Sequence, residues 1–410
     1  MTLPHRSRHA QRIPDPTTAG DFCRRFDERD VDTLTNVIND VRVNVWQQQP
    51  GAFLEEAILE GDGAMAETTG QCKQGMDINY KGQWGYHPLL ISLANTAEPL
   101  YLVNRSGNRP SHEGAAARFD QAIALCKRAG FKKVLLRGDT DFTQTAELDR
   151  WDAQGVRFIF GLDAMANLVK QAENLPETAW KPLKRAAKQE AKTQPRERPS
   201  NVKEQIVRAR EFKNIRLVSE QVAEFDYSPT LCEQTYRVAV IRKNLSMEQG
   251  ERVLFDDIRY FFYITNDRRA PASDIVFLAN ERCDQENLIE QLKNGVRALQ
   301  MPVDHLVSNW AYMVMASLAW SLKAWFALLL PERGRWKQRY RQDKQAVLKM
   351  EFKRFVNAFV RLPCQVLRSG RRLLYRLLAW NPWQAVFLRG VDGLRRLTFP
   401  VPAAYRPLRC

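Results

Sequence analysis

The sequence contains no CxxC pair, although seven cysteines are scattered along its 410 residues. Zinc ribbons and disulfide-rich folds depend on regularly spaced cysteines, so neither a zinc site nor a disulfide framework is predicted. An odd number of dispersed thiols in a chain of this length suits a reducing cytoplasm, which is the expected location. The polar, basic N-terminus also lacks the apolar stretch of a signal peptide.

Acidic side chains are scarce near the C-terminus. Residues 331–410 contain 19 Lys and Arg but only 4 Asp and Glu, whereas residues 1–330 contain 43 of each sign. The C-terminal region therefore carries the whole net charge of +15. Such asymmetry indicates a polyanionic partner, either nucleic acid or an acidic membrane surface. The alternative is that these charges lie on a solvated helical face. This interpretation is weaker, because so many basic residues lie within 80 residues.

One long apolar run, residues 311–330, is about as long as a membrane span. Lys323 lies inside this run, together with Ser317 and Ser321. A central lysine costs roughly 2.5–3.5 kcal/mol on insertion scales. The run therefore predicts a buried core helix that closes at Pro331 and presents Lys323 at an edge.

The remaining sequence alternates strand and helix patterns. Strand-like runs and amphipathic helices follow one another in the order strand, two strands, helix, strand, helix, strand, which is typical of an α/β RNase H-like sheet. A basic linker follows at residues 175–213, and strand patterns return over 215–265. Five segments are expected: a helical N-terminal region (1–54), the first part of the core (55–165), a basic linker with a β-rich insertion (166–275), the second part of the core with a glutamate-bearing helix (276–330), and a basic helical C-terminal region (331–410).

Two aspartates each end an apolar strand. Asp62 closes the run AILEGD and Asp139 follows KKVLLRG. The carboxyl ends of strands are where an α/β sheet usually exposes its site. A lone aspartate at such a place is more simply a turn or cap residue. Asp141 competes with Asp139, because both lie in RGDTDF, but Asp139 is nearer the strand end and Asp141 is expected to cap the next helix.

A third carboxylate comes from a helix expected to begin near Asn280. Arg282, Glu286 and Lys293 are spaced i, i+4 and i+11, so on a regular helix they share one face. A carboxylate between two cations fits a metal ligand beside groups that hold DNA phosphate. The alternative is a solvated helix with ordinary ion pairs, such as Glu290 with Lys293, and the spacing alone favours that alternative.

These motifs resemble those of the DDE insertion-sequence transposases, specifically the insertion-sequence 4 superfamily and its insertion-sequence 1380 group. That superfamily is marked by Tyr, two residues, Arg, three residues, Glu, six residues, Lys, and the last three positions match Arg282, Glu286 and Lys293. The tyrosine position holds Ala279, which puts the role of that tyrosine in doubt. RGDTDF resembles the second-aspartate motif of the family, and residues 59–90 resemble its first-aspartate segment. The resemblance extends from about residue 10 to about residue 390.

The resemblance implies an RNase H-like core with a β-rich insertion between the second aspartate and the glutamate. It implies that Asp62, Asp139 and Glu286 bind two Mg²⁺ ions, or Mn²⁺, and catalyse DNA cleavage and strand transfer. Arg282 and Lys293 would position DNA phosphate. The implied partners are the inverted-repeat ends, the target DNA and a second copy in the active complex, with no membrane involved.

The sequence is also compatible with two other interpretations. Only 61 residues precede Asp62, which is short for the group, so part of an N-terminal end-binding region is expected to be missing. The chain could then be an inactive or truncated relative that only binds DNA. A peripheral membrane protein using residues 305–390 is a third, weaker interpretation.

Overall fold

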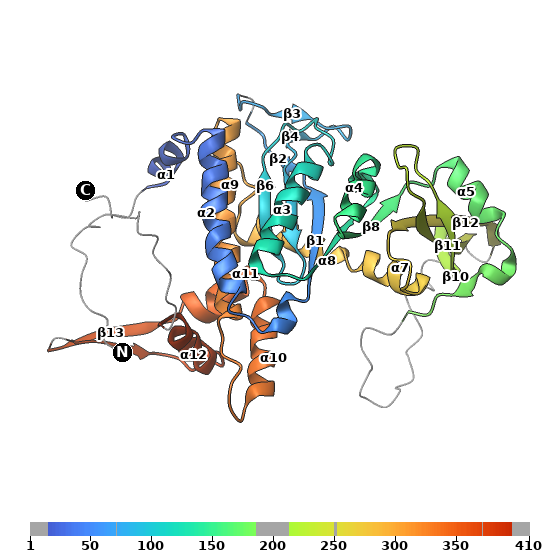
Figure 1. Ribbon diagram of the computed structural model, residues 1–410. Helices are drawn as coiled ribbons and strands as arrows, with labels where there is room; N and C mark the ends of the chain where they lie inside the picture. Colours follow the sequence, from blue (N-terminus) through green and yellow to red (C-terminus); the bar gives the residue numbers. More distant parts are fainter. Residues whose placement is uncertain (1–14, 71, 186–212, 250–251, 371, 396–410) are drawn as a thin grey trace. The chain divides into compact units, whose positions relative to one another are not determined.

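The computed structural model describes residues 15–70, 72–185, 213–249, 252–370 and 372–395. Contacts divide the chain into two units (Figure 1): residues 1–134 with 283–410 form unit 1, and residues 135–282 form unit 2. The expected linker at residues 175–213 falls mostly on residues 186–212, which lie outside the described residues.

Unit 1 begins with two helices, α1 (Pro16–Cys23) and α2 (Glu28–Trp46). Asp27 caps α2: its side chain accepts from the amide of Asp30 at 2.8 Å, and the Asp30 side chain accepts from the Asp27 amide at 3.1 Å. This reciprocal pair satisfies two amides that the first turn leaves open. Both helices lie in the N-terminal region, residues 1–54, that was predicted to be helical. A short 3-10 turn, η1 (Gly51–Leu54), leads into the sheet.

The sheet of unit 1 has the antiparallel order β6-β5-β1, formed by β1 (Glu56–Gly63), β5 (Leu89–Leu93) and β6 (Glu98–Val103). Helix α3 (Ala115–Ala129) packs on these strands and ends at Gly130, whose φ of 100° favours glycine. All four elements were predicted. A small sheet between β1 and β5, in the order β2 (Ala66–Glu67), β4 (Trp84–Tyr86), β3 (Asp77–Ile78), was not predicted, because strands of two or three residues have no measurable period.

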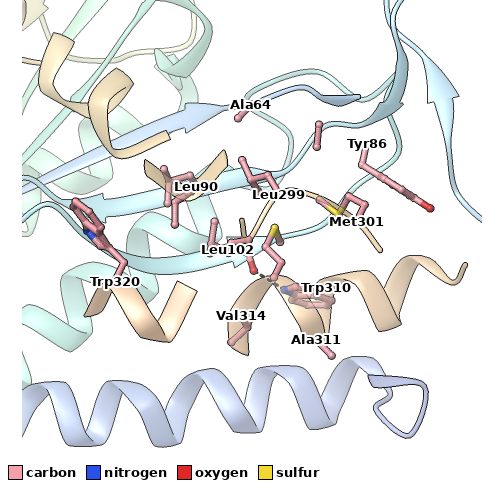
Figure 2. Packing of buried hydrophobic residues seen from close by; sticks show 14 of the residues in the cluster. Ala64, Tyr86, Leu90, Leu102, Leu299, Met301, Trp310, Ala311, Val314 and Trp320 are labelled. Atoms are coloured by element: carbon pink, nitrogen blue, oxygen red, sulfur yellow. Dashed lines mark hydrogen bonds between the residues drawn. The ribbon is translucent and has the colours of Figure 1, made fainter. Parts of the chain in front are cut away.

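The apolar run forms α9 (Leu306–Leu328), which packs beside α2 and against β6. It is the one helix in the described part of the chain that is long and apolar enough to span a membrane. Its side chains join a cluster of buried apolar residues, in which the indole of Trp310 donates to the carbonyl of Leu102 (Figure 2). A core helix was therefore the right prediction, although it ends at Leu328, before Pro331.

The predicted position of Lys323 at an edge is wrong. Lys323 is fully buried, and its ammonium donates to the carbonyls of Leu348 and Met350, each at 2.8 Å. The same group lies 3.5 Å from the centre of the Trp320 ring. The last residue of α10 (Lys337–Leu348) and the segment that follows it supply the acceptors that the burial of the lysine requires.

The C-terminal region is not wholly helical, which corrects the prediction for residues 331–410. After α10 come α11 (Phe352–Phe355), a π-helical turn η6 (Val356–Val360) and then a hairpin of β13 (Cys364–Ser369) and β14 (Arg372–Leu377). Helix α12 (Gln384–Arg395) follows. The turn between the strands contains Gly370 at a φ of 59°, a conformation that ends a helix but suits a tight hairpin.

Unit 2 contains the sheet order β7-β8-β12-β11-β10-β9, in which only β7 and β8 are parallel. Its strands are the end of β7 (Lys133–Gly138), β8 (Arg157–Leu162), β9 (Lys181–Pro182), β10 (Lys213–Tyr227), β11 (Tyr236–Gln249) and β12 (Arg252–Thr265). Among the described residues, unit 2 also contains the α-helices α4 (Leu148–Ala153), α5 (Ala166–Glu173) and α7 (Ala272–Asn280). The strands predicted over residues 215–265 are thus present and are longer than their sequence patterns suggested.

The late helix is interrupted, unlike the single helix that was predicted. Helix α7 ends at Asn280, α8 spans Cys283–Glu290, and a π-helical turn, η5 (Gln291–Gly295), follows directly. Lys293 lies in that π-helical turn and Arg282 lies in the break before α8. The i, i+4, i+11 argument assumed 3.6 residues per turn throughout, so it does not apply to this segment.

Candidate active site

Asp62 lies at the carboxyl end of β1, one residue before the strand ends. It is opposite Leu90 of β5 in the antiparallel register and is half-buried. Its Oδ1 accepts from the amide of Gly63 at 2.8 Å. Ala57 and Leu59 of the same strand are fully buried, so the core fixes the strand and thereby places the carboxylate at its end.

His87, which the sequence analysis did not single out, lies beside this strand end. A Cβ placed on Gly63 would be 2.8 Å from His87 Nε2. His87 Nδ1 is 2.8 Å from the carbonyl of Arg109, and because a carbonyl only accepts, Nδ1 carries the proton and Nε2 is the acceptor in the neutral ring. His87 lies within residues 59–90, the segment that resembles the first-aspartate segment of the family.

Glu286 is exposed on α8, whose buried side packs on the sheet of unit 1. The neighbouring Gln285 is 1% exposed and its amide donates to the hydroxyl of Ser92 on β5 at 3.3 Å. Leu288, one turn further on, joins the cluster that contains Leu90, the register partner of Asp62. The helix that carries Glu286 is therefore held against the strand next to β1.

Asp139 follows β7 and caps the 3-10 turn η2 (Thr140–Phe142), its Oδ1 accepting from the amide of Asp141 at 3.1 Å. The prediction that Asp141 is the capping residue is wrong: Asp141 lies inside the turn and is exposed. Burial raises the pKa of Asp139, with the Arg282 guanidinium opposing that shift and the Asp141 carboxylate adding to it. Asp139 Oδ2 is 3.5 Å from Arg282 Nη1.

The approach of Arg282 to Asp139 depends on Arg137. The side chain of Arg137 is 3% exposed, and its Nη1 donates to the carbonyl of Leu278 at 2.6 Å and to Glu281 at 3.2 Å. Arg137 precedes Asp139 by two residues and Glu281 precedes Arg282 by one, so the same contacts fix the end of α7 against the end of β7. A buried arginine in a strand gave no signal in the sequence, because its partner is remote along the chain.

The predicted site residues are divided between the two units. Asp62, Glu286 and the half-buried Lys293 belong to unit 1, whereas Asp139 and Arg282 belong to unit 2. Within the described ranges, no three His, Cys, Asp or Glu residues are grouped closely enough to hold a metal ion. The convergence of the three carboxylates therefore stays a prediction. Ala279, at the tyrosine position of the motif, is buried in α7.

Comparison with known proteins identifies the family. The family described as "Transposase DDE domain group 1" matches residues 7–399. No curated protein matches the chain. Among solved structures, the chain is similar to one titled "Cryo-EM structure of piggyBac transposase synaptic complex with hairpin DNA", with 9% identity and a TM-score of 0.32 over 78% of this chain and 67% of that one. Because the family match spans nearly the whole sequence, the chain belongs to the DDE transposase domain group 1 family.

Proposed function

We propose that this DDE transposase cuts DNA at the ends of an insertion sequence and joins the freed 3′ ends to target DNA, in a reaction that requires a divalent metal. The observation that carries the proposal is the 3.5 Å approach of Asp139 and Arg282 in unit 2. This contact brings the second-aspartate motif RGDTDF close to Arg282 of the Arg282, Glu286, Lys293 motif, although the two motifs are far apart in the sequence. We also propose the finer assignment to the insertion-sequence 4 superfamily and its 1380 group.

The donor set fits hard divalent cations. Asp62, Asp139 and Glu286 offer carboxylate oxygens, which suit Mg²⁺ or Mn²⁺. Burial raises the pKa of Asp139, so a nearby positive charge would favour its ionised form. Two bound ions would supply an activated nucleophile and offset the charge on the leaving oxygen. The proposed ligands are therefore Asp62, Asp139 and Glu286, with two Mg²⁺ ions as the cofactor.

The side chains of the chain itself would bind and orient the DNA. Arg282 offers a planar guanidinium that can hold a phosphate through two hydrogen bonds, and Lys293 offers a point charge. Both would fix the scissile strand and offset charge that develops in the transition state. The basic residues 331–410 would hold further backbone phosphates with little sequence preference. A homodimer in the active complex and a cytoplasmic location complete the proposal.

Substitution of Glu286 tests the proposal. Glu286→Gln keeps the size of the side chain but removes the charge that a divalent ion needs, so Mg²⁺-dependent cleavage of DNA carrying the element's ends should be abolished, while binding to those ends stays nearly intact. Glu290→Gln is the matched control, because Glu290 Oε1 accepts from Asn294 at 2.7 Å and glutamine can keep that hydrogen bond.

Two results would contradict the proposal. Cleavage by Glu286→Gln at the rate of the parent would remove Glu286 from the site. Absence of cleavage by the parent, with DNA binding intact, would instead identify the chain as an inactive relative that only binds DNA.

A further inference from the structure

The hairpin β13–β14 is an arm of unit 1 whose strands pair with each other alone among the described residues. The ladder continues past the strands, since the amide of Leu378 donates to the carbonyl of Pro363 at 3.0 Å. Figure 1 shows the arm extending away from α12 and the helices near its base. Six residues per strand correspond to a length of about 20 Å.

The base of the arm is firmly fixed. The Trp383 ring lies 5.8 Å from Phe359, and Phe359 lies 5.2 Å from Phe326 of α9, between ring centroids. Asn381 donates from its side-chain amide to the carbonyl of Ala358 at 2.8 Å and accepts from the Trp383 amide at 2.9 Å. These contacts join the segment after β14 to the helix core, so the arm is a defined element with a packed root.

Both faces of the arm are open to solvent. Cross-strand partners share a face, which places Val366 with Tyr375 on one side and Leu367 with Leu374 on the other. Val366 is 53% exposed, Tyr375 49% and Leu374 44%. An isolated two-stranded hairpin is at best marginally stable in water. Apolar side chains on both faces therefore indicate that a partner covers the arm.

The charge of the arm identifies the chemistry of that partner. Between Glu351 and Asp392 the sequence has eight Lys and Arg residues and no Asp or Glu. Three of these arginines, Arg368, Arg372 and Arg376, are exposed on the arm. In the part of the chain that the structure describes, none of the three forms an ion pair. The complementary surface is therefore an anionic one.

We infer that the arm binds duplex DNA as a two-stranded ribbon in the major groove. This inference rests on the proposed function, which makes DNA the expected polyanion. The major groove is about 12 Å wide and admits a two-stranded β-ribbon. The long side chains of Arg368, Arg372 and Arg376, which come from both faces of the ribbon, would reach the phosphates on either side of the groove. Apolar contacts with base edges would cover the face of the ribbon that carries Val366 and Tyr375. A second copy of the arm is a poor partner, because both surfaces would be positively charged.

The test measures the binding of full-length protein to a fluorescein-labelled 20-base-pair duplex of arbitrary sequence, by anisotropy, in EDTA and at several salt concentrations. The triple substitution R368A/R372A/R376A should weaken binding roughly tenfold or more and lower the log–log salt slope by about 2.7, since each phosphate contact contributes about 0.9. The triple substitution to lysine keeps the charges and should restore most of the slope. Tyr375→Ala should weaken binding without changing the slope, because tyrosine carries no charge.

The matched control removes three exposed lysines outside the arm, K127A/K133A/K170A, and should change the slope much less. Equal slopes for the two alanine triples would overturn the inference. The inference would also be overturned if R368A/R372A/R376A bound DNA like the parent and instead lost self-association in sedimentation. The same holds if this variant bound DNA like the parent and instead lost binding to vesicles of anionic phospholipid. Thermal melting confirms that each variant is folded. Because the binding assay contains EDTA, its result is independent of cleavage. If Glu286→Gln cleaves DNA like the parent, the proposed active site is wrong but the inference about the arm is unaffected. If the arm variants bind DNA like the parent, the inference is wrong but the proposed active site is unaffected.

Discussion

Arg42 and Glu98 form an ion pair in the interior of unit 1, with 3.1 Å between Nε and Oε1 and side-chain exposures of 2% and 0%. Arg42 comes from α2 and Glu98 opens β6. The same carboxylate accepts from three further side chains, those of Trp46, Thr96 and Trp325. Burial lowers the pKa of Arg42 and the charge of Glu98 opposes that shift. One carboxylate thus joins α2, β6 and α9, the elements that surround the core.

Glu98→Gln should strongly destabilise the protein. The substitution leaves the guanidinium of Arg42 buried without its counter-charge and turns an amide donor toward groups that also donate. Breaking a buried pair in this way costs roughly 3–5 kcal/mol. Urea unfolding, monitored by tryptophan fluorescence, measures the change.

The comparison variant is Glu55→Gln. Glu55 pairs with Lys132 at 2.6 Å, but the side chains are 55% and 64% exposed. An exposed pair of this kind is worth about 0.2–1 kcal/mol. A similar loss of stability in both variants would mean that the buried pair has no special structural role.

The sequence was sufficient to predict the regular elements of the core but not the polar contacts that join them. The strand at β1 and the helices α2 and α3 follow from period and capping signals, which are local. Arg42 lies in a helix with many charged residues, and nothing in the sequence distinguishes this buried arginine from a solvent-exposed arginine. Its partner is remote along the chain, as is the partner of Arg137 in unit 2.

The candidate site was predicted only in part for the same reason. Asp62 and Asp139 follow from the ends of apolar strands, a local signal, and the resemblance supplied Glu286. The regular spacing of Arg282, Glu286 and Lys293 hid a helix break and a π-helical turn, which depend on tertiary packing. The only local sign of His87 in the sequence is its place two residues before the apolar strand β5. Its position beside Gly63 becomes visible only when β1 and β5 are paired.

Burial lowers the pKa of Lys323 to about 7, with the charge of Glu98 opposing that shift. An unfolded lysine binds its proton up to a pH near 10.5, so between about pH 7 and pH 10 the unfolded chain binds more protons and stability should rise with pH. At 1.36 kcal/mol per pH unit the full rise is on the order of 4 kcal/mol. Lys323→Met removes this dependence, although it also leaves the carbonyls of Leu348 and Met350 without a donor.

The measurement is the difference in unfolding free energy between parent and Lys323→Met at pH 7, 8, 9 and 10. Taking the difference at each pH removes the contribution of other titrating groups. The parent should gain stability relative to the variant as the pH rises. A difference that is constant over this range would show that Lys323 keeps an ordinary pKa in the fold.

Gly63→Ala should disturb the end of β1. The new Cβ would be 2.8 Å from His87 Nε2 and 3.2 Å from the Cβ of Ser111. The His87 ring has little freedom to move, because its Nδ1 is held by the carbonyl of Arg109. Metal-dependent cleavage should therefore fall more than tenfold. Gly51→Ala is the control, since nothing lies within 4 Å of its added Cβ.

A double-mutant cycle tests whether the clash is the cause. His87→Ala removes the ring, so the melting temperature of the double variant should be higher than the sum of the two single effects predicts. Additive effects would show that Gly63 is required for another reason, such as the backbone geometry at Asp62.

Asp139→Asn should raise the stability of the metal-free protein at neutral pH. Because burial raises the pKa of Asp139 above its ordinary value, the folded state favours the neutral acid, and the parent loses stability as the pH rises through the folded pKa. Asparagine is neutral at every pH and avoids that loss. Below the ordinary pKa of aspartate, about 3.9, the two proteins should melt alike. The measurement is the melting temperature in EDTA from pH 3 to pH 8.

Addition of Mg²⁺ should reverse the order at neutral pH. A ligand that binds only the folded state stabilises it by mass action, and Asp139→Asn removes one of the proposed ligands. The parent should therefore gain melting temperature with Mg²⁺ and the variant should gain much less. Asp141→Asn is the control for the response to Mg²⁺: Asp141 is exposed and is not a proposed ligand, so this variant should gain melting temperature with Mg²⁺ as the parent does. If Asp141→Asn lost the response to Mg²⁺ and Asp139→Asn kept it, Asp141 and not Asp139 would be the metal ligand, and the site would have to be redrawn around it.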